Sequence, residues 1–445
     1  MASSKNTQAN DAVDRTPTAA ADDSARQRDE IPSDLKAYDR SWVFSLFGTA
    51  VGAGILFLPL NAGIGGFWPL LIVTLLIPGM TYFSHRALSR FVCLSPGYAD
   101  DITVVAAQYF GKIPGWIITI LYFLAIYPIV LIYGVSITNT VNSFFVNQMG
   151  WPEVPRAILS AILIAAMMAV LLWGERLMLI VTGWMVYPLI ACLFGVSIYL
   201  IPSWDFRGLM EIGDNSPSSI IYSVFIIIPV MVFAFNHSPA ISQFSVAMQR
   251  AHGSRSTQHA SRVLFWTMIL LVVFTMFFVW SCVLALGPDG MAEAKEQNLP
   301  VLSYLANVHG NPLISYLGPL VAFAAIVSSF FGHYLGAAEG AAGLVRASAP
   351  AFVEKVGMKA INTGVAVFMF VTTWIAAIMN PSILSIIESL SGPVIASILY
   401  LMPMIAIYTV DVFKPYRKNA SNIFVIVTGL IAISGIFLGL VHLFS

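Results

Sequence analysis

The sequence carries very little charge for its length. Only 10% of its 445 residues are Asp, Glu, Lys or Arg, against about 25% in an ordinary soluble domain. Of the 44 charged residues, 14 lie within the first 40 positions. A soluble protein of this size needs a more charged surface, so the scarcity excludes a soluble enzyme, a nucleic-acid binder and a disordered scaffold. Because 58% of the residues are hydrophobic, we expect a lipid bilayer to be the solvent for most of the chain.

Cysteine is also scarce. Cys93, Cys192 and Cys282 are far apart, lie in or beside apolar segments and show no metal-ligand spacing. They indicate buried, reduced thiols, and nothing in the sequence indicates a cofactor. Residues 1–40 have almost no large apolar side chains, which predicts a disordered cytoplasmic tail ahead of a transmembrane domain at 41–445.

Long apolar segments stand in place of the missing charge. A helix needs roughly 20 apolar residues to cross a bilayer, and eleven segments qualify. The sequence therefore predicts an all-α integral membrane protein with about eleven spans, at 41–60, 67–92, 115–146, 156–174, 178–201, 218–236, 261–287, 313–345, 361–379, 382–409 and 421–444.

The basic residues are distributed unevenly between the loops. With the N-terminus inside, the inner segments hold 19 Lys and Arg residues and the outer segments only Arg156, Arg207 and Lys295. This bias predicts a cytoplasmic N-terminus and a periplasmic or extracellular C-terminus. The inner loop at 93–114 has acids at 100–101 and a glycine at 111, which predict a short interfacial helix.

The first span contains two glycines in mid-membrane. Gly52 and Gly54 flank a single small residue, and interrupted backbone in a membrane is tolerated only where it faces protein or a water-filled cavity. Unwinding here would expose the amides near Ala53 and Gly54 at the positive end of a half-helix, which suits a carboxylate. The alternative is that Gly48 and Gly52 only form a small-residue packing face.

The sixth span has a stronger signal. The run Phe235-Asn236-His237-Ser238-Pro239 is a poor continuation of a lipid-exposed helix, since proline removes one helix hydrogen bond. Either the helix ends at Phe235 and a loop follows, or the helix is broken there and resumes, because 240–248 is semi-apolar. We favour the broken helix.

The two interruptions occupy matching positions if the chain is built from two five-helix halves. We expect one repeat at about 41–201, a second at about 218–409 and an extra helix at 421–444. Broken helices at corresponding positions of two halves indicate an inverted-repeat transporter, although no residue-level repeat is visible.

At these residues the chain resembles the hydroxy/aromatic amino acid permeases of the APC superfamily, most closely the bacterial serine/threonine transporters. The similarity runs from about Trp42 to the C-terminus. It implies a LeuT-like 5+5 inverted repeat with helices 1 and 6 broken, and amino acid import coupled to an ion gradient. The matching stretches are 48–54, 188–202, 235–239, 332–336, 379–384 and 391–393.

A zwitterionic substrate presents a carboxylate and an ammonium group that backbone can bind. We expect the amides of Gly52, Ala53 and Gly54 to bind the carboxylate. Carbonyls freed by the breaks can accept from the ammonium, the candidates being those of Thr49, Phe233 and Phe235.

Side chains near the breaks would then recognise the side chain of the substrate. Asn236, His237 and Ser238 supply donors and acceptors for a hydroxyl side chain. Tyr122 or Tyr127 in the third span could close the site, and Tyr127 is preferred because it precedes a proline. A packed or interfacial aromatic is the alternative for either tyrosine.

Ionisable groups within spans are costly and usually functional. His237, His333, Glu339 and Glu388 are therefore candidates for coupling or gating. His333 can titrate in the working pH range, although a structural histidine is an equal alternative. Glu388 is a candidate outer gate or proton acceptor, and Glu339 lies nearer the inner end, where it could simply pair with Arg346.

Ser328 and Ser329 in the eighth span suggest a second kind of coupling. In LeuT-like sodium carriers, which the chain resembles, hydroxyls of this span and first-span carbonyls bind one sodium ion. The matching carbonyls here are those of Gly48 and Val51, while back-bonding within the helix is the alternative role for the serines. The resemblance favours proton over sodium symport.

We therefore expect a secondary active importer of L-serine, with L-threonine also considered, in the cell inner membrane. The alternative substrate is an aromatic amino acid, tryptophan or tyrosine. The expected partners are the small-molecule substrate and lipid, with no nucleic acid and no obligate protein partner. An intramembrane enzyme would need a nucleophile–base pair or an acid–metal cluster, and His237 has no acidic neighbour in the sequence.

Overall fold

The computed structural model describes residues 34–63, 65–98, 100–172, 175–212, 215–308 and 312–444. Side chains are described except at Ala53, Glu388, Ser389 and within 172–183, 312–314 and 435–444. Every regular element in these ranges is a helix. The principal helices are α2 (Leu35–Ala50), α3 (Ala53–Ala62), α4 (Phe67–Cys93), α5 (Ile102–Phe110), α6 (Lys112–Ser143), α7 (Arg156–Leu172), α8 (Glu175–Tyr199), α9 (Phe206–Glu211), α10 (Pro217–Ala234), α11 (Ser238–His252), α12 (Ser256–Glu296), α13 (Val301–Val308), α14 (Pro312–Ser348), α15 (Pro350–Val356), α16 (Met358–Met379), α17 (Ile383–Ile386), α18 (Gly392–Ala396), α19 (Met402–Thr409) and α20 (Ser421–Phe444).

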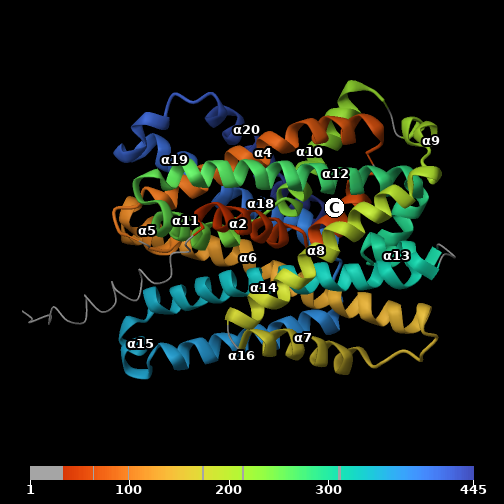
Figure 1. The fold of residues 1–445 in the computed structure, drawn as a ribbon, viewed down its shortest axis with the longest axis horizontal. Coiled ribbons are helices and arrows are strands. Elements are labelled where there is room, and N and C mark those ends of the chain that lie inside the picture. Colours follow the sequence, from red (N-terminus) through yellow and green to blue (C-terminus); the bar gives the residue numbers. More distant parts are fainter. Residues whose placement is uncertain are drawn as a thin grey trace, which may run out of the picture.

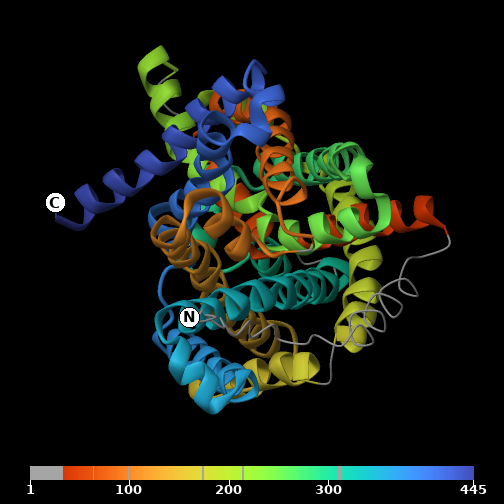
Figure 2. The same ribbon diagram turned by 90° about the vertical axis from the view of Figure 1, so that its left-hand side faces the viewer.

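The long helices form a bundle along the longest axis of the molecule (Figure 1). Helices α6 and α14 pack side by side through the bundle, and α7 and α16 pack together along one edge. Figure 2, turned by 90°, shows α12 and α14 strongly foreshortened, so they run in similar directions. This arrangement lets most of the apolar helices cross one bilayer together.

The prediction of a multi-span helical protein is confirmed. Among the described residues, eight helical segments are long and apolar enough to span a membrane, and α2 and α3 together form a ninth that is bent by 56°. Two shorter apolar helices, Arg156–Leu171 and Ser421–Ser434, coincide with the predicted fourth and eleventh spans. The total of eleven spans stays a prediction, as does the division into two repeats.

The first span is broken where the glycines indicated. Helix α2 ends as the N–H of Val51 donates to the carbonyl of Phe47, and Gly52 is extended with φ −137° and ψ −153°. Helix α3 starts at Ala53 in a new direction. At its other end α2 is capped by Asp34, whose carboxylate accepts from the amides of Ala37 and Lys36; these hydrogen bonds lower the pKa of Asp34.

The sixth span is also broken, and the reading that it ends in a loop is wrong. Helix α10 ends at Ala234, three residues follow, and α11 resumes at Ser238 with Pro239 in its first turn, where a missing N–H costs nothing. The Asn236 side chain caps the new helix, because its Oδ1 accepts from the amide of Ser238 at 3.0 Å.

The predicted interfacial helix is present as α5. Asp101 caps its start by accepting from the amides of Thr103 and Val104. Gly111 ends it with φ +89°, a conformation that favours glycine. The acid and the glycine therefore acted as the start and stop signals that the sequence suggested.

Three spans differ from the sequence prediction. The first span begins at Leu35, so six residues of the predicted disordered tail are helical. Helix α12 continues nine residues past the predicted end at 287, through a kink where Gly287 has φ +63°. The tenth span is assembled from α17, α18 and α19 joined by wide helical turns at Ile387–Ser391 and Ser397–Leu401. Its Gly392 lies directly against the carbonyl of Pro229 in α10, where a Cβ atom would be only 2.4 Å from that oxygen.

Candidate functional site

The two helix breaks lie against each other. A Cβ atom built on Gly54 would be 2.7 Å from Cδ1 of Phe233 and 3.0 Å from the Cα of Ala234. The first turn of α3 therefore touches the last turn of α10, which the absence of a side chain at Gly54 makes possible. Segments about 180 residues apart in the chain thus meet at one place, as the sequence prediction requires.

The first break offers mainly backbone. The amides of Ala53 and Gly54 open α3, and the first N–H groups of a helix have no acceptor within it. The helix dipole adds partial positive charge at the same end. Neither break contains an Asp, Glu, Lys or Arg residue, so this is a neutral site with a weakly positive pole, which suits the carboxylate of a zwitterion.

Gly52 packs too closely for any side chain. A Cβ atom there would be 2.4 Å from Oγ of Ser329 and 2.7 Å from the hydroxyl of Tyr133. These two groups hydrogen-bond to each other at 2.7 Å, and Oγ of Ser329 also lies 2.9 Å from the carbonyl oxygen of Thr49. Helices α6 and α14 therefore support the unwound backbone of the first span.

The second break offers side chains. Asn236, His237 and Ser238 are each at most 3% exposed. Nδ1 of His237 lies 3.1 Å from the carbonyl of Phe235, which places the ring proton on Nδ1 and leaves Nε2 as an acceptor. Among the described residues, neither Nε2 of His237 nor Nδ2 of Asn236 has a hydrogen-bond partner, although both atoms are buried. Buried polar atoms are nearly always paired, so this pair calls for an explanation.

His85 of α4 holds the second break in place. Its ring stacks on that of His237 with centroids 3.6 Å apart and an interplanar angle of 6°. Nδ1 of His85 is 2.8 Å from the carbonyl of Thr81, and Nε2 accepts from the backbone N–H of His237 at 3.2 Å. Both contacts fit a neutral imidazole with its proton on Nδ1.

The carbonyls predicted to bind an ammonium group each accept one hydrogen bond already. Thr49 accepts from Ser329, Phe233 from the amide of Asn236, and Phe235 from His237. A carbonyl oxygen has two lone pairs, so each retains one acceptor position.

The tyrosines predicted to close the site lie in different surroundings. The ring of Tyr127 stacks between two phenylalanine rings. Its centroid is 4.8 Å from that of Phe123 and 5.5 Å from that of Phe368 in α16. Tyr122 is buried, with its hydroxyl 3.5 Å from the position of a Cβ on Gly336. Tyr133, which the sequence prediction did not name, is the third-span tyrosine that contacts the first break.

The residues proposed for ion coupling are only partly brought together. Ser329 reaches the first span through Thr49, whereas Oγ of Ser328 donates back to Ala325 of its own helix at 3.2 Å. His333 joins the same cluster, with Nδ1 2.9 Å from the carbonyl of Ser329. Gly48 and Val51, whose carbonyls are the proposed sodium ligands, lie in and directly after the last turn of α2. Gly48 packs against Val186 of α8.

The structure gives less support for the two acidic candidates, Glu388 and Glu339, as coupling or gating residues. The backbone of Glu388 lies in the wide helical turn of the tenth span, and its side chain is outside the described part of the structure. Oε1 of Glu339 is buried and has no hydrogen-bond partner among the described residues. The expected pairing of Glu339 with Arg346 is absent from the ion pairs that the described residues form.

Solved structures share this architecture. MhsT in complex with L-phenylalanine aligns with a TM-score of 0.59 at 15% identity, covering 88% of this chain and 98% of MhsT. Mhp1, a nucleobase-cation-symport-1 family transporter in a closed conformation, aligns with a TM-score of 0.55 at 16% identity, covering 90% of each chain. At this identity the likeness shows the fold alone, and that fold is the LeuT-like one with helices 1 and 6 broken.

Sequence relatives are much closer. The serine transporter SdaC of Escherichia coli K12 is 47% identical over 406 residues, which are 90% of this chain and 95% of SdaC. The threonine/serine transporter TdcC of Escherichia fergusonii is 39% identical over 420 residues, covering 89% of this chain and 94% of TdcC. The sequence model of the tryptophan/tyrosine permease family matches residues 42–444. With its two broken helices in contact and almost its whole length covered by these matches, the chain belongs to the tryptophan/tyrosine permease family of membrane transporters.

Proposed function

We propose that this protein is a secondary active transporter that imports L-serine, with L-threonine as a second substrate, across the cell inner membrane by ion symport. The observation that carries the proposal is the pair of buried, unpartnered atoms Nδ2 of Asn236 and Nε2 of His237. The proposal is also supported by the 47% identity to a serine transporter over most of both chains.

A hydroxyl group suits this pair of atoms. The amide N–H of Asn236 can donate to the hydroxyl oxygen, and the hydroxyl proton can be donated to Nε2 of His237. A substrate without a hydroxyl leaves both buried groups unsatisfied, which costs about 1–3 kcal/mol. Tryptophan could satisfy His237 with its indole N–H but has no acceptor for Asn236, so the pair favours serine and threonine over tryptophan.

The groups that all amino acids share would bind at the backbone. The amides of Ala53 and Gly54 receive the carboxylate, and the remaining lone pairs of the Thr49, Phe233 and Phe235 carbonyls receive the ammonium. Each interaction uses dipoles rather than full charges, so the site stays neutral once the zwitterion is bound.

Substrate can reach this place only if helices move. Asn236 and His237 are each 1% exposed, so the breaks are closed on both sides. We infer that α2 and α11 swing away on one side and α3 and α10 on the other, in alternation. The basic-residue bias assigns α2 and α11 to the cytoplasmic side, with the C-terminus of the chain outside.

We propose a proton rather than sodium as the coupling ion. Ser329 already donates to Thr49, and Ser328 bonds to its own helix, so the two hydroxyls do not converge on one position. Buried ionisable side chains, by contrast, lie near the breaks at His85, His237 and His333. The proton proposal is supported by this contrast.

The test is uptake of labelled amino acids by proteoliposomes, with pH and sodium gradients imposed separately. We expect saturable accumulation of serine under an inward proton gradient, competition by threonine, weaker competition by alanine, and little competition by tryptophan. Failure of serine to accumulate under either gradient would contradict the transport proposal. Accumulation of tryptophan or tyrosine in its place would establish the aromatic alternative.

A further inference from the structure

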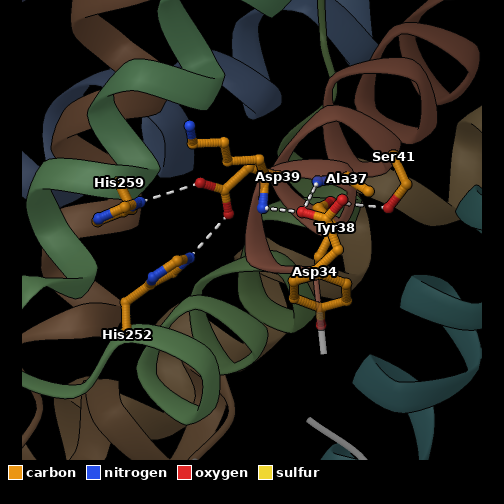
Figure 3. A network of polar contacts seen from close by, with 8 residues as sticks. Asp34, Ala37, Tyr38, Asp39, Ser41, His252 and His259 are labelled. Carbon is orange, nitrogen blue, oxygen red and sulfur yellow. Dashed lines mark hydrogen bonds and ion pairs between the residues drawn. The ribbon is translucent and has the colours of Figure 1, made fainter. Parts of the chain in front are cut away.

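A cluster of three potential metal ligands lies outside the substrate site. Asp39 of α2, His252 at the end of α11 and His259 near the start of α12 have ligand atoms that all lie within 4.8 Å of one another. Figure 3 shows one nitrogen of each imidazole directed at the carboxylate of Asp39. Nothing in the transport mechanism above uses these residues.

The geometry of the cluster is compact. Nε2 of His252 is 2.7 Å from Oδ1 of Asp39, and Nδ1 of His259 is 2.9 Å from Oδ2. The two rings stack with centroids 3.7 Å apart and an interplanar angle of 11°. The tight turn at Gly253–Arg255, where Gly253 has φ +53°, folds α12 back so that the rings can meet.

Two imidazoles and a carboxylate are the donor types that Zn²⁺ selects. Zn–N and Zn–O distances of about 2.0–2.2 Å place neighbouring ligand atoms in a tetrahedral site roughly 3.3 Å apart. The two hydrogen-bonded pairs need to widen by about half an ångström to reach that spacing. The ligand atoms that lie up to 4.8 Å apart need to draw together by about 1.5 Å. Each neutral imidazole can keep its one proton by moving it to the nitrogen turned away from Asp39, which frees a lone pair for the metal.

The setting predicts an exchangeable ion rather than a permanently held one. The side chain of His252 is 4% exposed, while those of Asp39 and His259 are 18% and 27% exposed, so the site is open on one side. Three protein ligands leave a fourth position for water. Nearby cationic side chains oppose a dication, but all are exposed and screened by solvent, namely Lys36, Arg40, Arg250, Arg255 and Arg262.

We propose that Asp39, His252 and His259 form a binding site for a first-row transition-metal dication, Zn²⁺ above all, that locks α2 against α11 and α12. Helix α2 precedes the first break and α11 follows the second, so the cluster joins the moving halves of both broken helices. His259 ties both helices to α12, which does not take part in the proposed movement, so a bound ion holds α2 and α11 in the closed position and stops the cycle. The locking effect rests on the proposed transport function, whereas metal binding does not.

Binding is tested on the full-length protein, purified through a tag without histidines, by titration with Co²⁺ as a spectroscopic substitute for Zn²⁺. We expect one ion per chain, the visible absorption of tetrahedral Co²⁺, and its displacement by Zn²⁺. Asp39→Asn and His252→Gln should weaken binding on the order of 100-fold, at least the effect of losing an outer-shell partner. Asp411→Asn is the matched control, because this exposed carboxylate pairs only with Lys414 and Arg417 among the described residues.

His259→Cys separates a metal site from a hydrogen-bonded cluster. A thiolate binds Zn²⁺ and Co²⁺ but cannot stack on His252, so this variant should retain binding and add a thiolate-to-Co²⁺ charge-transfer band. The proposal is overturned if the parent protein binds no stoichiometric Co²⁺, or if Asp39→Asn and His252→Gln bind it as well as the parent does.

The lock is tested by serine uptake with Zn²⁺ present on both sides of the membrane. We expect inhibition in the parent and in Asp411→Asn, and its relief in Asp39→Asn. Bound metal without any effect on serine uptake would overturn the lock. Absence of serine uptake in every metal-free sample, with Co²⁺ binding intact, would instead contradict the proposed transport function.

Discussion

Both helix breaks interrupt the helical backbone of a membrane span, but they are built from different kinds of residue. The first is built from glycines and presents amides, and Gly52 has no room for a single extra carbon atom beside Ser329. The second is built from Asn236 and His237 and presents side-chain atoms that are buried without partners among the described residues. The first break depends on the absence of side chains at its glycines, and the second depends on its polar side chains.

The difference suggests a division of labour in substrate recognition. In the proposed function, backbone amides and carbonyls bind the carboxylate and ammonium groups, which all amino acids share. Side chains at the second break would recognise the group that distinguishes one amino acid from another. Damage to the first break should therefore affect every substrate, whereas damage to the second should depend on the substrate.

The largest effect is expected from Gly52→Ala. The new Cβ would lie 2.4 Å from Oγ of Ser329 and 2.7 Å from the hydroxyl of Tyr133, and overpacking of this kind costs about 1–3 kcal/mol. Because the displaced backbone carries the amides proposed to bind the carboxylate, we expect accumulation of serine, threonine and alanine alike to be lost in proteoliposomes.

Gly364→Ala is the matched control, since a Cβ there meets nothing within 4 Å, and it should transport normally. Loss of serine uptake alone in Gly52→Ala, with other amino acids unaffected, would contradict the division of labour.

A smaller and selective effect is expected from Asn236→Ala. Removing the proposed donor to the substrate hydroxyl should raise the KM for serine about 5- to 150-fold, the equivalent of 1–3 kcal/mol. Alanine uptake in the same variant should change little. Asn236 also caps α11 through Ser238, so Asn236→Ser, which keeps a capping oxygen, separates the two roles. Equal losses for serine and alanine would point to capping alone.

The smallest effect is expected from Ser329→Ala. The variant loses hydrogen bonds to Thr49 and Tyr133, each with a net contribution of about 0.5–1.5 kcal/mol to stability. These bonds support the first break without a proposed contact to substrate, so uptake should fall only several-fold. If the coupling ion is a proton, varying the sodium gradient changes uptake in neither the parent nor the variant. Sodium-dependent uptake in the parent that weakens in Ser329→Ala would place a sodium ion beside the first break.

The sequence indicated the elements of this fold because their signals are local. Apolar length marked the spans, Gly52 and Gly54 marked the first break, and Asn236 through Pro239 marked the second. Asp101 and Gly111 marked the ends of α5. Each of these signals acts within a few residues, through hydrogen bonds and backbone sterics that need no distant partner.

The partners of the breaks could not be predicted in the same way. His85 and Tyr133 lie in otherwise regular apolar helices, and they matter only because α4 and α6 pack beside segments more than 100 residues away in the chain. Tyr127 attracted attention because a proline follows it, but that signal concerns the helix and not its neighbours. An ionisable residue within an apolar span itself indicates a functional role. Applying this criterion to every span would add His85 to the candidates.

The hydrogen bond from the backbone N–H of His237 to Nε2 of His85 contributes to the energy barrier to opening in the proposed transport cycle. In the proposed cycle α11 moves away from α4, and the buried N–H of His237 then loses its acceptor while the His237 ring loses its stacked neighbour. Leaving a buried donor unsatisfied costs about 1–3 kcal/mol, so the closed form is held by a contact that must be replaced before the protein can open. Water entering from the open side can replace it, which makes hydration of the second break part of the barrier between the two states.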